Sequence, residues 1–183
     1  MGNIFVISGH SGVGKTTIVY KILKQDKNIE KIVTCTTRKI RDEERNGVDY
    51  NFVSKKEFEQ WIKEDKLIEY EKYAGNYYGS KKEDVQKIID SGKNVMFVVE
   101  TKGALTFKEK FEKPILIFIK APSLNELINR LKGRGEDEKL IQKRMDEVTN
   151  ELAREKEFDY IVINNDLERA VEEISKIIKK EVN

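Results

Sequence analysis

The octapeptide at residues 9–16, Gly-His-Ser-Gly-Val-Gly-Lys-Thr, constrains the fold more than any other part of the chain. The apolar run at 4–7 predicts a buried strand directly before it, and the spacing of apolar residues predicts a helix over 15–25 directly after it. Glycines at these spacings let backbone N–H groups point into a tight turn, and the first turn of the helix adds partial positive charge. The segment therefore predicts a phosphate-binding loop between a strand and a helix.

The rest of the chain alternates between apolar runs and helical patterns. Three further runs predict buried strands at 94–99, 114–119 and 160–163. Helices are predicted between and after them, at 81–91, 101–111, 123–132, 137–157 and 167–181. A serine placed three residues before a glutamate predicts a capping box at three helix starts, at Ser54, Ser80 and Ser123. This alternation predicts an α/β fold of three layers, in which helices cover both faces of a central parallel sheet.

Two segments interrupt that alternation. The first, residues 33–80, has β-like runs at 48–53 and 67–73, a short helix around 58–62 and turns at 46–47 and 75–76. These features predict a small α+β lobe inserted into the core. The second, residues 123–150, is helical and basic, and Gly133 and Gly135 interrupt it, which predicts a mobile arm. We expect a single domain over 1–183, whose core comprises 1–32, 81–122 and 151–183.

Composition narrows the partners and the setting of the protein. Lysine and arginine number 35 against 33 aspartates and glutamates, and the resulting net charge of +2 argues against a dedicated nucleic-acid binder. Cys35 is the one cysteine and His10 the one histidine, so the chain has neither an intramolecular disulfide nor a zinc cluster. The sequence has no apolar run of about 18 residues and no signal-peptide pattern at its N-terminus. We therefore expect a cytoplasmic protein without a nucleic-acid or membrane partner.

Lys15 and Thr16 supply the expected chemistry of the loop. The Lys15 ammonium would bridge the β- and γ-phosphates of a nucleotide, and the Thr16 hydroxyl would bind a Mg²⁺ ion that also contacts those phosphates. A chance glycine-rich turn is the alternative, and the strand before the loop and the helix after it argue against that alternative. The loop predicts nucleotide binding but does not identify the acceptor of a phosphoryl group.

The 33–80 lobe contains residues that suit a monophosphate. Arg38 and Arg41 place two guanidinium groups three residues apart, and Tyr50 and Tyr78 add two phenols. Guanidinium groups hold a phosphate through paired hydrogen bonds, to which the phenol hydroxyls can add. Ordinary surface charge is the alternative explanation for the two arginines, because 37% of all residues are charged.

Glu69 and Ser80 in the same lobe can read a nucleobase. Guanine presents N1–H and N2–H donors, which a carboxylate accepts, and an O6 acceptor, which a hydroxyl or an N–H group satisfies. Adenine presents an acceptor at N1, which would face the lone pairs of a buried carboxylate. Because the wrong base leaves polar groups without partners, this pair of side chains favours guanine over adenine.

Longer strings in these segments resemble those of one known family, the guanylate kinases. They are Thr-Thr-Arg-x-x-Arg at 36–41, Asn-Gly-x-Asp-Tyr-x-Phe-Val at 46–53, Gly-Asn-Tyr-Tyr-Gly-Ser at 75–80, Arg-Leu-x-x-Arg-Gly at 130–135 and Asn-x-Asp at 164–166. The resemblance extends from the phosphate loop to the last helix. It implies a P-loop NTPase fold with a core that holds ATP, a GMP-binding lobe at 33–80 and a helical lid at 123–150.

The resemblance also implies the activity and the residues of the site. The expected reaction is phosphoryl transfer from MgATP to GMP, and to dGMP, by a monomer or weak homodimer. The expected catalytic residues are Lys15, Arg41, Arg134 and Arg144. The expected ATP ligands are Gly9, His10, Ser11, Gly12, Val13, Gly14, Lys15, Thr16, Thr17, Arg130, Arg134 and Asn164, and Thr16 is also expected to bind Mg²⁺. The expected GMP ligands are Thr34, Arg38, Arg41, Tyr50, Glu69, Tyr78, Ser80 and Glu100.

Three positions depart from the family pattern. Guanylate kinases usually carry Asp-x-Asp where this chain has Val-Val-Glu at 98–100, so the first of two carboxylates is missing. His10 stands where proline is common, and we interpret it as a residue on the surface of the loop. Glu43 replaces a usual glycine beside two other acidic residues, and we expect the added negative charge near Arg41 to weaken binding of the monophosphate.

Two other functions stay open at this point. A kinase that phosphorylates a ribose bisphosphate occurs on a related fold, and the valine at position 98 leaves that alternative open, although Glu69 and Ser80 argue against it. Guanylate-kinase-like domains that bind peptides without catalysis are the second alternative. Such domains typically have degraded phosphate loops, whereas this chain retains Lys15 and Thr16.

Overall fold

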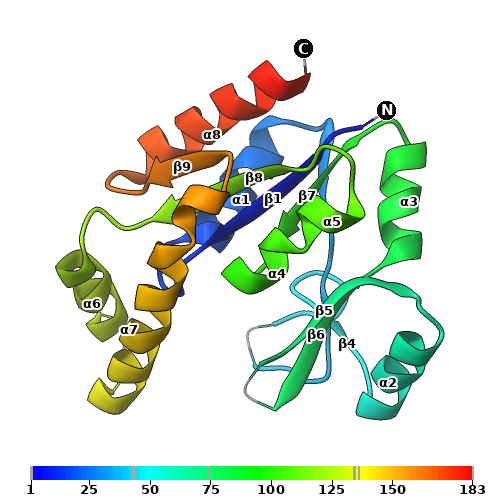
Figure 1. The fold of residues 1–183 in the computed structure, drawn as a ribbon, viewed down its shortest axis with the longest axis horizontal. Coiled ribbons are helices and arrows are strands. Elements are labelled where there is room, and N and C mark those ends of the chain that lie inside the picture. Colours follow the sequence, from blue (N-terminus) through cyan, green and yellow to red (C-terminus); the bar gives the residue numbers. More distant parts are fainter. Residues whose placement is uncertain (1, 43, 74, 134, 136, 183) are drawn as a thin grey trace.

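A computed structural model describes residues 2–42, 44–73, 75–133, 135 and 137–182. Its central sheet has five parallel strands in the order β2-β7-β1-β8-β9 (Figure 1). These strands are β1 (Ile4–Gly9), β2 (Ile29–Lys31), β7 (Asn94–Val98), β8 (Ile115–Lys120) and β9 (Tyr160–Ile163). Four of them are the predicted apolar runs. The fifth, β2, was missed because it has three residues, of which only Ile29 is buried.

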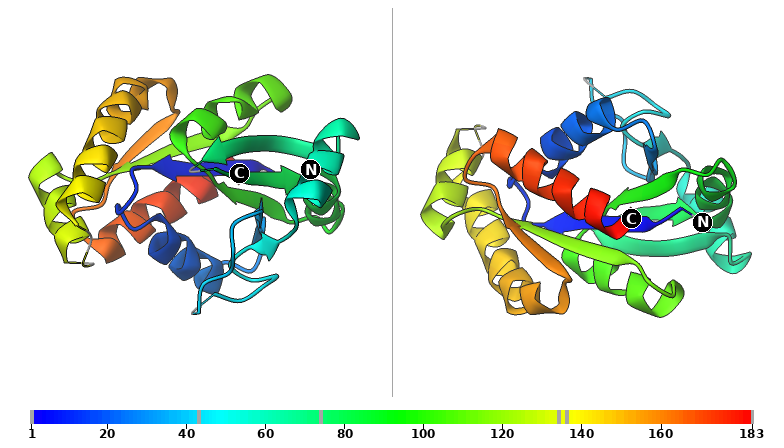
Figure 2. Two further views of the ribbon diagram at one scale, coloured as in Figure 1. Left: turned by 90° about the horizontal axis from the view of Figure 1, so that it is seen from below. Right: turned by 90° about the horizontal axis from the view of Figure 1, so that it is seen from above.

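Helices cover both faces of this sheet, as predicted. Buried Phe5 and Ile7 of β1 pack in one cluster with α1 (Lys15–Gln25) and α8 (Leu167–Val182). The alternate residues of β1, Ile4 and Val6, pack on the other face with α3 (Lys82–Asp90), α4 (Thr101–Leu105) and α5 (Phe107–Lys110). Figure 2 shows α1 and α8 together on one side of the sheet and α4 and α5 on the other. Successive side chains of a strand point to opposite faces, so one apolar run serves two cores.

The predicted helix over 101–111 is divided into α4 and α5. The division falls at Thr106, whose hydroxyl donates a hydrogen bond of 2.8 Å to the Gly103 carbonyl oxygen. Such a bond from a threonine to the preceding turn competes with the regular helical ladder.

The lobe has its own sheet of four strands, in the order β4-β3-β6-β5. The strands and the one helix of the lobe are β3 (Cys35–Thr36), β4 (Asn51–Phe52), α2 (Lys55–Lys63), β5 (Leu67–Tyr73) and β6 (Asn76–Lys81). Cys35, Phe58, Trp61 and Leu67 form a separate small core beneath this sheet. Of the β-like run at 48–53, only β4 is a strand, since residues 46–50 turn back on themselves at Gly47, where φ is +79°.

At two of the three predicted capping boxes the serine side chain caps the helix as expected. The Ser54 and Ser123 hydroxyl oxygens each accept a hydrogen bond of 3.1 Å from the backbone N–H three residues later. The box predicted at Ser80 is wrong, because Ser80 lies in β6 and α3 begins only after Lys81. Its hydroxyl faces a side chain of β5 instead, as described below.

Two helices form the 123–150 segment, α6 (Leu124–Lys132) and α7 (Glu138–Ala153). The carboxylate of Asp137 accepts a hydrogen bond of 2.8 Å from the Leu140 N–H and so caps the start of α7. The predicted helix to 157 ends earlier, and a short 3₁₀ turn at Glu155–Glu157 follows. In Figure 1, α6 and α7 extend from the sheet on one side, and β5 and β6 extend on the other. Among the described residues, no helix combines the length and the apolar character that a bilayer crossing requires.

Candidate active site

The carboxyl ends of the parallel strands border a cleft of about 960 Å³. Residues that follow β1 and β7 form the core side of the cleft, as expected at the edge where parallel strands end. The lobe and α7 form its other sides. Of the predicted site residues, those that line the cleft are Ser11, Thr16, Thr34, Arg38, Arg41, Tyr50, Glu69, Tyr78, Glu100 and Arg144.

The phosphate loop depends on glycines at its two ends. Gly9 has φ of +138°, and a Cβ atom at this position would lie 1.9 Å from the Ile119 carbonyl oxygen of β8. Gly14 has φ of +97°, and its Cβ atom would lie 2.9 Å from the side-chain amide nitrogen of Asn164. Both the backbone conformation and the close approach of neighbouring atoms therefore require glycine.

Lys15 folds back over this loop. Its ammonium donates hydrogen bonds to the Gly9 carbonyl oxygen and, at 3.1 Å, to the His10 carbonyl oxygen. Thr16 is exposed in the first turn of α1 and lines the cleft. The first turn of α1 has no acidic residue, so its partial positive charge is available to an anion.

Asn164 contacts the phosphate loop, and Arg130 in turn contacts Asn164. The Asn164 side-chain amide is buried and donates a hydrogen bond of 2.7 Å to the Val13 carbonyl oxygen. The Asn164 carbonyl oxygen accepts a bond of 3.0 Å from Arg130, whose guanidinium also pairs with Glu126 at 2.9 Å. In this arrangement both residues hold the protein backbone, and their direct contact with ATP stays a prediction.

His10 is buried rather than placed on the loop surface, so that interpretation was wrong. Its side chain is 2% exposed, and Nδ1 lies 2.9 Å from a carboxylate oxygen of Glu151 in α7. The ring also makes an edge contact with Phe118 at 5.1 Å between centroids. One residue further along the loop, Arg144 of α7 donates a hydrogen bond to the Ser11 hydroxyl. The predicted ligand Arg134 lies outside the described residues.

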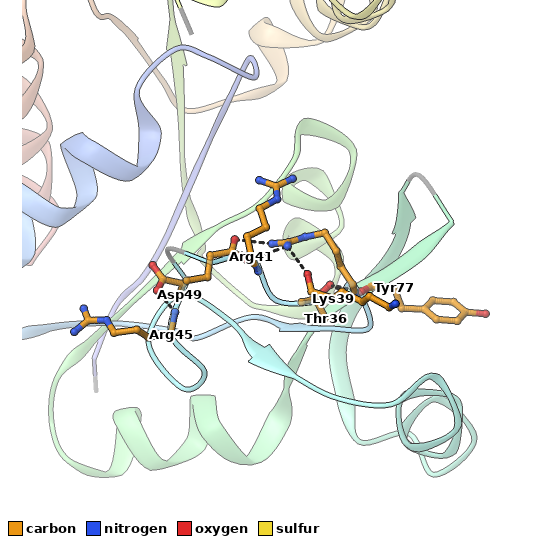
Figure 3. Close-up of polar contacts among 8 residues, drawn as sticks. Thr36, Lys39, Arg41, Arg45, Asp49 and Tyr77 are labelled. Carbon is orange, nitrogen blue, oxygen red and sulfur yellow. Dashed lines mark hydrogen bonds and ion pairs between the residues drawn. The ribbon is translucent and has the colours of Figure 1, made fainter. Parts of the chain in front are cut away.

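Glu44 fixes the arginine turn of the lobe. Its two carboxylate oxygens accept hydrogen bonds from the Arg38 guanidinium at 2.7 and 2.9 Å, and one of them also accepts the Arg41 N–H at 2.9 Å. This pairing raises the pKa of Arg38, which stays charged, and lowers the pKa of Glu44. Figure 3 shows the turn, in which the side chain of Arg41 extends away from Thr36. Glu43, the other acidic residue expected to matter here, lies outside the described residues.

The two predicted phenols meet beside Arg38. The rings of Tyr50 and Tyr78 make an edge contact at 6.0 Å, and the Arg38 guanidinium lies 5.3 Å from the centroid of the Tyr50 ring. Burial raises the pKa of Tyr50, so its hydroxyl keeps its proton and can donate a hydrogen bond to a phosphate oxygen. The structure therefore brings two arginines and two phenols of the lobe to one side of the cleft.

Glu69 and Ser80 form the buried end of the lobe site. Glu69 is 6% exposed, and one of its carboxylate oxygens accepts a hydrogen bond of 2.8 Å from the Ser80 hydroxyl. Burial raises the pKa of the Glu69 carboxyl to about 7. The other oxygen faces Gly103 of α4, where a Cβ atom would lie 4.0 Å from it. The carboxylate thus has one oxygen fixed by Ser80 and a second directed across the cleft.

Glu44 and Glu71 are two of the carboxylates that line the cleft but were not predicted as site residues. Glu71 lies two residues after Glu69 in β5 and so shares its face of the strand. Burial, and then the charge of Glu100, raises the pKa of Glu71. The two-residue period of the β5 run was the signal for Glu71. The position of Glu44 depends on how the turn folds, which no local pattern encodes.

Comparison with known proteins gives the family of the chain. The chain matches the family model of the guanylate kinases over residues 1–181. It belongs to the guanylate kinase family. The guanylate kinase of Oceanobacillus iheyensis is 40% identical over 181 residues, which cover 98% of this chain and 88% of that protein. The guanylate kinase of Halalkalibacterium halodurans is 42% identical over 181 residues, which cover 98% of this chain and 89% of that protein.

A solved guanylate kinase has the same fold. The crystal structure of the guanylate kinase from Anaplasma phagocytophilum superposes with a TM-score of 0.81 at 31% identity, and the match covers 98% of this chain and 86% of that one. The predicted α/β fold of the P-loop NTPase type, with its parallel central sheet, is thereby confirmed. A protein from Thermus thermophilus, TT1252, is 13% identical with a TM-score of 0.55, and this likeness extends to the fold alone.

Proposed function

We propose that this member of the guanylate kinase family transfers the γ-phosphoryl group of ATP to GMP, and also to dGMP, which yields ADP and GDP or dGDP. One observation carries the proposal: a single cleft of about 960 Å³ is lined both by Ser11 and Thr16 of the phosphate loop and by Arg38 and Glu69 of the lobe. A donor triphosphate and an acceptor monophosphate can therefore meet within one enclosure.

Glu69 is proposed to select guanine. Its oxygen that faces Gly103 can accept the N1–H and N2–H donors of guanine, while Ser80 holds the other oxygen. Adenine would bring the N1 lone pair against the same carboxylate, which is repulsive in a buried site. Glu100 lines the same cleft and is proposed as a second acceptor for the base.

The arginines and phenols are proposed to hold the GMP phosphate. Arg38 is already oriented by Glu44, and Arg41 extends its guanidinium from the same turn. Tyr50 and Tyr78 lie beside Arg38, and their hydroxyls can donate hydrogen bonds to the phosphate oxygens. The acceptor oxygen of GMP is anionic, so the protein needs no general base to activate it.

Thr16 is proposed to bind Mg²⁺ together with the phosphates of ATP. The described residues contain no group of three histidine, cysteine, aspartate or glutamate side chains that could hold a metal. A single protein hydroxyl suits Mg²⁺, which usually keeps several waters and takes the rest of its ligands from phosphates. When bound, the ion would neutralise charge on the β- and γ-phosphates.

Catalysis is proposed to consist of alignment and neutralisation of charge. Lys15 would leave the Gly9 and His10 carbonyl oxygens and move onto the phosphates, and Arg144 already lies at the loop through Ser11. We propose that the lobe at 33–80 and the lid at 123–150 close over the core, so that the lid brings Arg130 and Arg134 toward ATP. Closure would also exclude water as a competing acceptor.

A substrate panel tests the proposal. ADP release from MgATP is measured with GMP, dGMP, AMP, CMP, UMP and a ribose bisphosphate in parallel. We expect release with GMP and dGMP only. Release with the ribose bisphosphate alone would replace the proposed acceptor, and a folded protein that releases no ADP with any of them would indicate a binding domain without catalysis.

A further inference from the structure

Two polar contacts join the phosphate loop to one face of α7. Arg144 donates to the Ser11 hydroxyl, and the Glu151 carboxylate lies 2.9 Å from Nδ1 of His10. Arg144 and Glu151 are seven residues apart, which is about two turns of helix and places them on the same face. Val148, between them on that face, is 1% exposed in the main core. α7 therefore contacts the loop over two turns in this structure.

The His10 side chain is held on more than one side. It is 2% exposed, its ring meets the edge of Phe118, and Glu151 itself is 17% exposed. A buried polar pair is costly to separate, because each group would lose its partner without gaining full contact with water. The contact between His10 and Glu151 therefore limits movement of the loop relative to the last turn of α7, beyond the lid at 123–150.

The backbone of His10 meanwhile contacts the catalytic lysine. Its carbonyl oxygen accepts a hydrogen bond of 3.1 Å from the Lys15 ammonium and one of 3.3 Å from the Val13 N–H. His10 thus accepts a hydrogen bond from Lys15 through its carbonyl group and contacts α7 through its imidazole. The adjacent residue, Ser11, holds Arg144.

We propose that His10 and Glu151 form a positioning pair for phosphoryl transfer. The pair holds the first turn of the phosphate loop against α7, which sets the separation between Arg144 and the phosphates onto which Lys15 would move. This inference rests on the proposed function, and it assigns the two side chains a role through the loop and α7 rather than through contact with the substrate. A small change in that separation lowers the rate, because charge neutralisation depends on the geometry in the transition state.

Two substitutions of His10 separate its hydrogen bond from its packing. His10→Phe retains a ring of similar shape against Phe118 and removes the donor to Glu151. His10→Asn retains an N–H group near the position of Nδ1 and removes the ring. Glu151→Met tests the same contact from α7, and Glu173→Met, at an exposed position of α8, is the matched control.

We expect His10→Phe and Glu151→Met each to lower kcat about tenfold, the loss that one hydrogen bond to a charged group supports. The KM for GMP should change less than about twofold, because the pair lies on the ATP side of the cleft. The double variant should be no slower than either single variant, since both remove the same contact. His10→Asn should keep kcat within about threefold of the unchanged protein, and Glu173→Met should match it.

A measurement without turnover accompanies the kinetics. Calorimetry should show weaker binding of MgATP to His10→Phe and Glu151→Met, and amide hydrogen exchange at residues 10–14 should be faster. Should His10→Phe not fold, Glu151→Met decides the question alone. Equal kcat for His10→Phe and His10→Asn, or single effects that multiply in the double variant, would overturn the inference. If the unchanged protein transfers no phosphoryl group to GMP, the proposed function fails, while the binding and exchange measurements still decide whether the pair positions the loop.

Discussion

Replacing Glu69 by Gln should stabilise the empty protein and impair its recognition of GMP. Burial raises the pKa of the Glu69 carboxyl from 4.5 to about 7, so ionising it in the folded protein costs free energy that ionisation in the unfolded chain does not. Glutamine keeps the acceptor for the Ser80 hydroxyl and removes the charge. The substitution therefore separates the cost of burying this charge from its use in binding.

The magnitude follows from proton linkage. Between the two pKa values the folded protein binds more protons than the unfolded chain, so Glu69 lowers stability as the pH rises through this window. The cost is about 3 kcal/mol near pH 8 and under about 1 kcal/mol near pH 5. Urea unfolding should therefore show a gain of that size for Glu69→Gln near pH 8 that fades toward pH 5. Glu172→Gln, at an exposed position of α8, is the control and should change stability by less than about 0.5 kcal/mol.

The same variant should gain stability but lose affinity for GMP. The KM for GMP should rise about 100-fold, because guanine loses hydrogen bonds to a charged acceptor, whereas the KM for ATP should change little. In the unchanged protein the KM for GMP should rise as the pH falls below about 7, where Glu69 takes up a proton. Equal stability of both proteins near pH 8, or parallel changes in the two KM values, would refute this account of Glu69.

Three further substitutions test other parts of the site. Lys15→Ala should lower kcat by more than about 100-fold with an unchanged melting temperature, and near-normal turnover would remove Lys15 from the mechanism. Glu44→Gln should raise the KM for GMP about tenfold and leave the KM for ATP unchanged, because the ion pair that orients Arg38 beside Arg41 is lost. An unchanged KM for GMP would show that this ion pair does not orient Arg38. Gly9→Ala should destabilise the protein by more than about 3 kcal/mol in urea unfolding, since its Cβ atom would lie 1.9 Å from a carbonyl oxygen of β8, and a stable variant would contradict the described loop.

Much of the fold was predictable because its signals are local. The apolar runs at 94–99 and 114–119 correspond to β7 and β8, since a strand buried on both faces must be apolar at every position. The short edge strand β2 escaped, because three residues with one buried side chain carry no periodicity. The cap predicted at Ser80 failed because β6 continues through this residue, and pairing with Glu69 on β5 outweighed a local capping pattern.

The candidate site also has features that the sequence predicts and features that it does not. Glycine spacing and the strings around Arg38 and Ser80 predicted groups whose chemistry depends on a few neighbouring residues. The burial of individual side chains could not be predicted from the sequence, so neither the raised pKa of Glu69 nor the enclosed position of His10 was expected. Both depend on side chains that other elements bring to the same place.

The phosphate loop illustrates the difference between what the local sequence determines and what tertiary packing adds. Its glycines, Lys15 and Thr16 follow from a backbone that must turn tightly between a strand and a helix, and eight consecutive residues encode that turn. What surrounds the loop depends on packing between distant segments: Glu151 reaches His10 across 141 residues and Asn164 reaches Val13 across 151. Such contacts arise only when the sheet aligns the ends of β1 and β9 and α7 packs beside them. The local sequence therefore determines the turn of the loop and its Lys15 and Thr16 side chains, whereas the tertiary structure determines which side chains hold the loop in position.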